Sequence, residues 1–153
     1  MKKNRFIAAL FIVLSILFIV SPPGGNKATD VFAVYYSPDG VDVVITHPPL
    51  TERQKITWWR HVRADLIHRL MQTGHRHIPE RWYVWDYGDG FKPAGKEDLI
   101  CFDDIPLPAN CLDKNIVMWI SPGEKGATRY TFEHGVINDP PEGNVKMQPG
   151  TSQ

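Results

Sequence analysis

A run of fifteen uncharged residues near the N-terminus, residues 6–20, all apolar except Ser15, constrains this chain more than any other feature of its sequence. Lys2, Lys3 and Arg5 precede the run. Basic residues on this side keep the N-terminus in the cytoplasm while the rest of the chain crosses the membrane. The sequence therefore predicts a single-pass inner-membrane protein that contacts the membrane through residues 6–20 and places its C-terminal domain in the periplasm.

The apolar run can be read as a membrane anchor or as a cleaved signal peptide. Its length lies at the upper edge for a signal peptide and just below the ~17 residues that a membrane-spanning helix needs. Signal peptidases cut after small residues, but Ser21 is followed by Pro22, which fits poorly after a cut. We therefore favour residues 1–25 as an N-terminal transmembrane anchor, with a signal peptide as the alternative.

Composition limits the exported part to one domain and argues against binding to nucleic acid. The 153 residues include 17 basic and 17 acidic side chains, and three of the basic ones precede the apolar run. The exported part therefore has a net charge near −3, whereas nucleic-acid binders show a basic excess. Residues 26–138 have the size of one domain. The polar residues 139–153 are rich in Pro and Gly and are expected to form a disordered tail.

The two cysteines, Cys101 and Cys111, are expected to form a disulfide bond. Thiols of exported proteins oxidise readily, and nine residues between the two cysteines can close a small loop. The spacing differs from the Cys-x-x-Cys pattern of redox motifs, and no further close ligands suggest a zinc site. Two free thiols are the alternative.

The patterning of the exported part predicts an α+β fold, in which one long α-helix packs on an antiparallel β-sheet that follows the N-terminal transmembrane helix. Residues 51–73 form the helix, with Thr51 and Gln54 as a capping box and Gly74 as the C-terminal stop. Its apolar residues recur at spacings of three and four, at Ile56, Trp59, Val62, Leu66 and Leu70. β-Branched and aromatic runs predict strands at residues 30–36, 41–46, 82–86, 99–103, 115–121 and 128–133.

Three segments, taken together in this order and spacing, carry a family resemblance. They are Trp58-Trp59, the stretch at residues 85–92 (WDYGDGFK), and the cysteine loop that begins CFDD and ends Asn110-Cys111. The chain resembles a family of uncharacterised enterobacterial membrane proteins of unknown function. The resemblance implies a short N-terminal membrane helix and an exported domain, and it supplies no catalytic residues.

An acidic cluster is the first candidate site. Asp86, Asp89, Asp103 and Asp104 flank strand ends that can lie side by side in a sheet. Grouped carboxylates can hold Ca²⁺ or act as general acid and base. The alternative is structural, because Asp side chains order tight turns through hydrogen bonds to their own backbone. The structural reading is favoured, so we assign no cofactor and no metal ligand, with Ca²⁺ as the alternative.

A basic helix face is the second candidate site. Residues 52–77 have a net charge of +4, whereas residues 86–113 have a net charge of −5. This polarity suits the recognition of a charged partner, unless the two segments simply face each other or water. The histidines at 61, 68 and 75 recur every seven residues and are read as part of a solvated face. The arginines of the basic face are Arg53, Arg60, Arg63 and Arg69.

No recognised catalytic motif accompanies these features, so a non-enzymatic role is favoured. The leading hypothesis is a protein-binding module of the periplasm, for example an inhibitor or immunity-like protein with an envelope protein as its partner. One alternative is a small metal-dependent hydrolase that uses the acidic cluster. A second alternative is a structural or accessory protein of the envelope.

Overall fold

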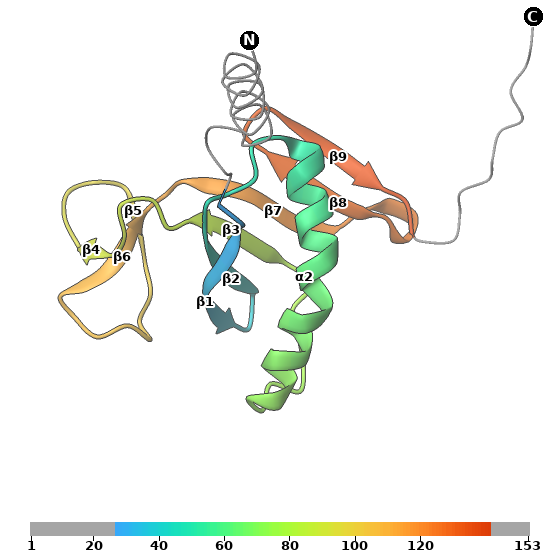
Figure 1. Ribbon diagram of the computed structural model, residues 1–153. Coiled ribbons are helices and arrows are strands. Elements are labelled where there is room, and N and C mark those ends of the chain that lie inside the picture. Colours follow the sequence, from blue (N-terminus) through green and yellow to red (C-terminus); the bar gives the residue numbers. More distant parts are fainter. Residues whose placement is uncertain (1–26, 142–153) are drawn as a thin grey trace, which may run out of the picture.

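The computed structural model describes residues 27–141, which contain one long helix and two β-sheets (Figure 1). The helix is α2 (Glu52–Gln72), and a 3₁₀ turn, η1 (Glu124–Gly126), precedes β8. The predicted anchor at residues 1–25 lies outside the described residues, as does nearly all of the predicted tail. Within residues 27–141, no helix is long and apolar enough to cross a membrane. The strands are β1 (Asp30–Ser37), β2 (Gly40–Thr46), β3 (Trp82–Asp86), β4 (Lys92–Pro93), β5 (Leu99–Cys101), β6 (Ala109–Asp113), β7 (Ile116–Pro122), β8 (Thr128–Phe132) and β9 (Gly135–Asp139).

Helix α2 forms as the sequence predicts. The Thr51 side chain accepts a hydrogen bond from the Gln54 amide, and the Gln54 side chain accepts one from the Thr51 amide. This capping box satisfies backbone donors that the first turn leaves unpaired. At the other end Gly74 adopts a φ of 96°, which glycine tolerates better than other residues. The predicted apolar stripe faces the sheet, with Trp59, Leu66 and Leu70 buried.

The main sheet has six strands in the order β1-β2-β3-β7-β8-β9. The α+β class is confirmed, but the prediction of an antiparallel sheet is wrong at one pairing, because β2 and β3 run parallel. Parallel neighbours need a long crossover connection, and α2 supplies it between Thr46 and Trp82. The remaining pairings in this sheet are antiparallel.

A second sheet, in the order β4-β6-β5, lies within the connection between β3 and β7. We call residues 87–115 the small lobe. The expected disulfide is present, since the Cys101 and Cys111 sulfurs are bonded and the two residues face each other across β5 and β6. Sequence analysis missed β4, β6 and β9, and strand 99–103 ends early at Cys101. Asp139, assigned to the tail, instead ends β9 and pairs with Thr128.

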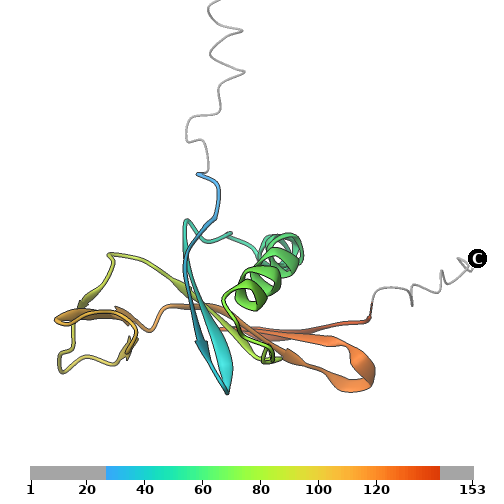
Figure 2. The same ribbon diagram turned by 90° about the horizontal axis from the view of Figure 1, so that it is seen from below.

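Strand β2 separates two hydrophobic clusters. Val41, Val43 and Ile45 pack with α2, whereas Val44 points to the opposite face and packs with Phe102 of the small lobe. Alternate residues of a strand face opposite sides of a sheet, so α2 and the small lobe cover opposite faces. Figure 2 shows them on the two sides of the β1–β2 hairpin. The sheet is therefore covered twice near β2, by different means on each side.

Candidate functional site

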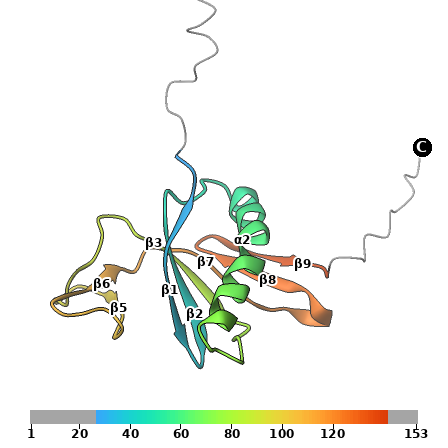
Figure 3. The ribbon, with the colours of Figure 1, turned by 60° about the horizontal axis from the view of Figure 1, so that its bottom comes forward.

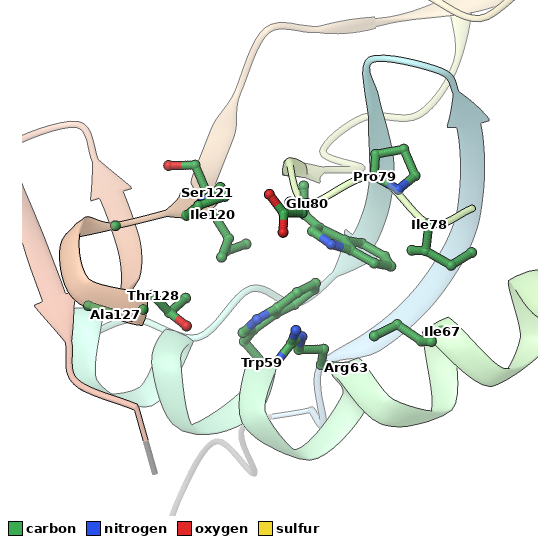
Figure 4. Close-up of a pocket in the computed structure, with 14 residues that line it drawn as sticks. Trp59, Arg63, Ile67, Ile78, Pro79, Glu80, Ile120, Ser121, Ala127 and Thr128 are labelled. Carbon is green, nitrogen blue, oxygen red and sulfur yellow. The ribbon is translucent and has the colours of Figure 1, made fainter. Parts of the chain in front are cut away.

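A cleft lies between α2 and the turn that joins β7 to β8 (Figure 4). Its volume is about 300 Å³, and Trp59 from α2, Trp82 from β3 and Ile120 from β7 supply its apolar lining. The Trp59 and Trp82 rings meet edge to face, with centroids 5.1 Å apart. Edge-to-face pairs are a favoured aromatic geometry, so this part of the wall is fixed by core packing.

Charged and polar side chains complete this opening. Arg63 from α2 and Glu80 from the loop before β3 reach into it from different sides, and Ser121 and Thr128 line the β7–β8 side (Figure 4). Among residues 27–141 neither Arg63 nor Glu80 forms an ion pair. The exposed lining of the cleft is therefore mainly polar, and buried aromatic and apolar side chains lie behind it.

The opening continues in both directions along the domain. Toward the end of β9, a cavity of about 600 Å³ shares Trp59, Arg63 and Thr128 with it. Toward the β1–β2 turn, a cavity of about 680 Å³ shares Pro79 and Glu80 with it. We call these three adjoining openings the α2 cleft. Its residues come from α2, the loop before β3, the β7–β8 turn and the end of β9, so distant parts of the sequence meet there.

The four arginines of the predicted basic face have different surroundings. Arg60 is ion-paired with Asp139, and Arg69 is ion-paired with Asp65 at 2.8 Å, one helical turn away. Arg63 lines the α2 cleft, whereas Arg53 lines a separate groove at the start of α2. The basic face is therefore divided between two openings and two local ion pairs.

The small lobe and α2 do not neutralise each other's charge. Within the lobe, Lys92 contacts Asp113 at 2.6 Å and Glu97 at 3.8 Å, and Lys114 contacts Asp98 at 2.5 Å. In the part of the chain that the structure describes, no ion pair joins the lobe to α2. The charge polarity seen in the sequence therefore places opposite charges on opposite faces of the main sheet.

The four aspartates of the predicted acidic cluster lie in or beside turns of the small lobe. The Asp86 carboxylate accepts a hydrogen bond from the Gly88 amide at 3.1 Å, which orders the turn that follows β3. Asp103 and Asp104 are exposed in the turn after β5, and Asp89 is exposed after β3. Residues 27–141 contain no group of three or more His, Cys, Asp or Glu side chains that could hold a metal ion.

Asp42 on β2 is a half-buried acid that the sequence analysis did not single out. Its carboxylate accepts a hydrogen bond from the Trp85 indole at 2.7 Å, on the side of the sheet that faces the small lobe. Burial raises the pKa of Asp42, and the bond from Trp85 opposes this rise. Desolvation disfavours a charged carboxylate, so the raised pKa means that ionised Asp42 costs stability. The alternation of side chains between the two faces of a strand could have indicated that Asp42 lies on the same face as Val44.

Two tyrosines, one on each face of the main sheet, have raised pKa values. Burial raises the pKa of Tyr130 at the α2 cleft, with a further rise from the Asp139 carboxylate and a lowering by Arg60. On the other face, burial and the Asp104 carboxylate raise the pKa of Tyr35. Because phenolate is disfavoured by both burial and nearby carboxylates, each tyrosine remains a neutral hydroxyl group at neutral pH.

The sequence analysis found Arg63 but missed the rest of the α2 cleft. Glu80, Trp82 and Thr128 lie far apart in the sequence and meet only because β3, β7 and β8 are neighbours. The predicted histidine stripe also separates, since His61 lines the groove at the start of α2 and His75 stacks on Tyr36 with centroids 3.9 Å apart. No local pattern in the sequence could have predicted which of these residues lie close together in the fold.

The fold and the cleft together define an α+β domain with a charged cleft between its helix and its main sheet. The chain belongs to the family described as Enterobacterial putative membrane protein (DUF943), which matches residues 1–148. This confirms the family resemblance noted in the sequence. The family description gives a membrane protein and names no activity. No curated protein and no solved structure matches the chain significantly.

Proposed function

We propose that this chain is a protein-binding module, anchored in the inner membrane by its N-terminal segment, that holds a segment of a periplasmic partner in the α2 cleft. The observation that carries the proposal is the composition of this cleft. Its base is formed by buried aromatic and apolar side chains, whereas its exposed lining is mainly polar. Arg63 and Glu80 offer opposite charges there, without ion-pair partners among the described residues. Interfaces gain affinity from such apolar cores and gain specificity from charged rims.

The shape and the charge of the molecule also support this proposal. The three adjoining openings of the α2 cleft share lining residues, so an extended segment could contact all of them in turn, which a single small molecule could not. The positive charge on α2 and the negative charge on the small lobe produce an electric field that can orient an approaching charged partner. An inhibitor or immunity-type role against a toxin that targets the envelope is one version of this proposal. The protein product of a neighbouring toxin gene would then be the first candidate partner to test.

Site-specific photocrosslinking of the full chain tests the proposal. A benzophenone amino acid at Ala127, which lines the α2 cleft, is expected to capture a distinct envelope protein. The same amino acid at Met71, an exposed residue of α2 outside the cavities described above, is the matched control and is expected to give no such adduct. Charge reversal by Arg63→Glu should weaken the binding of the purified partner by about tenfold or more, as for an interfacial arginine anchor.

Two results would contradict the proposal. One is the same set of adducts from position 127 and from position 71, which would show that capture is non-specific. The other is unchanged partner affinity in Arg63→Glu, with the variant's circular dichroism and melting temperature equal to those of the wild type. Release of the wild-type chain from membranes by carbonate would contradict only the anchor and would leave the cleft to be judged separately.

A further inference from the structure

A second groove, at the opposite end of α2 from Gly74, has a different chemical character from the α2 cleft. It has a volume of about 700 Å³ and lies between the first described residues, the 47–50 loop and the start of α2. Thr29 donates a hydrogen bond to the His47 carbonyl at 2.6 Å, which ties two of these walls together. We call it the entry groove, because Lys27 in its wall follows directly on the N-terminal segment.

The charged side chains that line the entry groove are all basic. Lys27 and Arg53 line it together with His47 and His61, and none of its described lining residues is acidic. Neither Lys27 nor Arg53 has an ion-pair partner among residues 27–141. The α2 cleft, in contrast, carries Glu80 and Asp139 beside its arginines. A site with only positive charges selects an anion rather than a mixed protein surface.

The entry groove also presents apolar side chains beside its cations. Leu50 is 81% exposed, the highest value among the large hydrophobic residues that the structure describes as exposed. Trp58 lines the same groove, and its buried indole N–H lacks a hydrogen-bond partner among the described residues. An exposed leucine, a tryptophan and basic side chains together form the composition of a surface that rests on a bilayer.

The position of the entry groove in the chain puts it near the membrane. Seven residue steps separate Val20, the last residue of the apolar run, from Lys27. A fully extended chain of this length spans at most about 25 Å. Figure 3 shows the first described residues and the start of α2 at the same end of the domain. If residues 6–20 span the bilayer, the entry groove lies within reach of the headgroups.

We propose that the entry groove binds the phosphate headgroup of an anionic phospholipid, with Lys27 and Arg53 contacting the phosphate and Leu50 directed toward the acyl region. This inference rests on the membrane anchor of the proposed function, but not on the partner of the α2 cleft. Phospholipid binding here would hold one end of α2 against the membrane. The α2 cleft would then keep a fixed orientation toward the periplasm.

Native mass spectrometry of the full chain in detergent tests this site. The chain is mixed with equal amounts of phosphatidylglycerol and phosphatidylcholine that carry the same acyl chains, and the ratio of retained lipids is measured. Wild type is expected to retain phosphatidylglycerol preferentially. The double variant Lys27→Gln/Arg53→Gln should lower this preference by about 30-fold, since each basic residue at an anionic lipid surface contributes about fivefold.

A matched double variant, Arg76→Gln/Arg129→Gln, removes the same charge from exposed positions outside the entry groove. It is expected to change the lipid preference by less than about twofold. An equal loss in both double variants would overturn the proposal, because it would reflect net charge alone. Equal retention by wild type and Lys27→Gln/Arg53→Gln would overturn it as well, because the lipid would then follow the apolar segment.

Two further measurements separate the alternatives. Inorganic phosphate at the same concentration should not displace phosphatidylglycerol, and displacement would show a site for free phosphate rather than for lipid. A photocrosslinker at Leu50 should form adducts with lipid in envelope preparations, and adducts with a protein alone would assign this surface to a protein partner. Lipid retention in detergent is independent of crosslinking at Ala127, so the two proposals can fail separately.

Discussion

The two faces of the main sheet are covered by hydrophobic clusters of very different size. On the α2 side, thirteen buried residues from the helix and from four strands form one continuous core. On the other side, the hydrophobic cluster that the structure describes has three buried members, Val44, Phe102 and Leu112, and partly buried aromatic rings surround them. Burial of apolar area contributes roughly 25 cal/mol per Å², so most of the hydrophobic stabilisation belongs to the α2 side.

The small lobe compensates for its thin core with a covalent link and stacked rings. Strands β4 and β5 have two and three residues, which is too short for hydrogen bonding alone to hold a sheet. The Cys101–Cys111 disulfide joins β5 to β6, and Phe102 stacks on Tyr35 of β1 with centroids 4.3 Å apart. One face of the main sheet is thus stabilised mainly by hydrophobic packing, and the lobe on the other face is stabilised in part by a disulfide bond.

The largest expected effect comes from truncating the α2-side core. Leu66→Ala removes a side chain that is 2% exposed and should lower the free energy of unfolding by about 2–5 kcal/mol, through lost burial and the cavity left behind. Chemical denaturation followed by tryptophan fluorescence measures this loss. Leu112→Ala, in the small lobe, is the matched control and should cost less. An equal or larger loss in Leu112→Ala would show that the two clusters are one cooperative core.

Removal of the disulfide is expected to have the next largest effect. In Cys101→Ala/Cys111→Ala the unfolded chain loses its closed loop, which should lower the free energy of unfolding by about 2–3 kcal/mol. Hydrogen exchange should accelerate mainly in β5 and β6, because β2 and β3 keep their core on the α2 side. Equal acceleration in β2 and β3 would contradict the separation of the two faces.

The smallest expected effects concern Asp42, at the seam between the main sheet and the small lobe. Asp42→Ala leaves the Trp85 indole N–H without its acceptor and should cost about 1–3 kcal/mol. Asp42→Asn keeps an acceptor oxygen and removes the half-buried charge, so this variant should be slightly more stable than the wild type at pH 7. Thermal melts of the three proteins at one pH measure both differences.

The pH dependence of this difference follows from the raised pKa of Asp42. The folded protein holds the Asp42 proton to a higher pH than the unfolded chain does, so this group makes stability fall as the pH rises through that interval. The higher stability of Asp42→Asn relative to the wild type should therefore disappear as the pH drops below 3.8, the ordinary pKa of aspartate. An advantage that grows on acidification would show that the charge of Asp42 is stabilising.

Sequence reasoning was most successful where local chemistry decides the structure. The capping box at Thr51, the glycine stop at Gly74 and the bounds of β1 and β2 depend on neighbouring residues and were predicted within one or two positions. Strands β4, β6 and β9 were missed because they are short or polar, and their pairing partners rather than their own side chains make them strands. The parallel pairing of β2 with β3 depends on where α2 packs.

The candidate site could be predicted only in part for the same reason. Arg63 and Arg53 stood out because helical spacing groups basic residues, yet the structure assigns them to different openings. Glu80 and Thr128 carry no local signal and enter the α2 cleft through strand order. The acidic residues were grouped by sequence proximity, but turns, rather than a shared ligand, explain the order at Asp86.

The small lobe leaves and rejoins the main sheet at a single point. Trp85 of β3 pairs with Ile116 of β7, and the Asp86 amide donates to the Asn115 carbonyl at 2.9 Å. The lobe is thus an insertion between two antiparallel neighbours that a tight turn could join directly. A chain in which a tight turn replaces residues 87–115 is therefore expected to keep α2 and its cleft, provided that the face around Val44 is made polar.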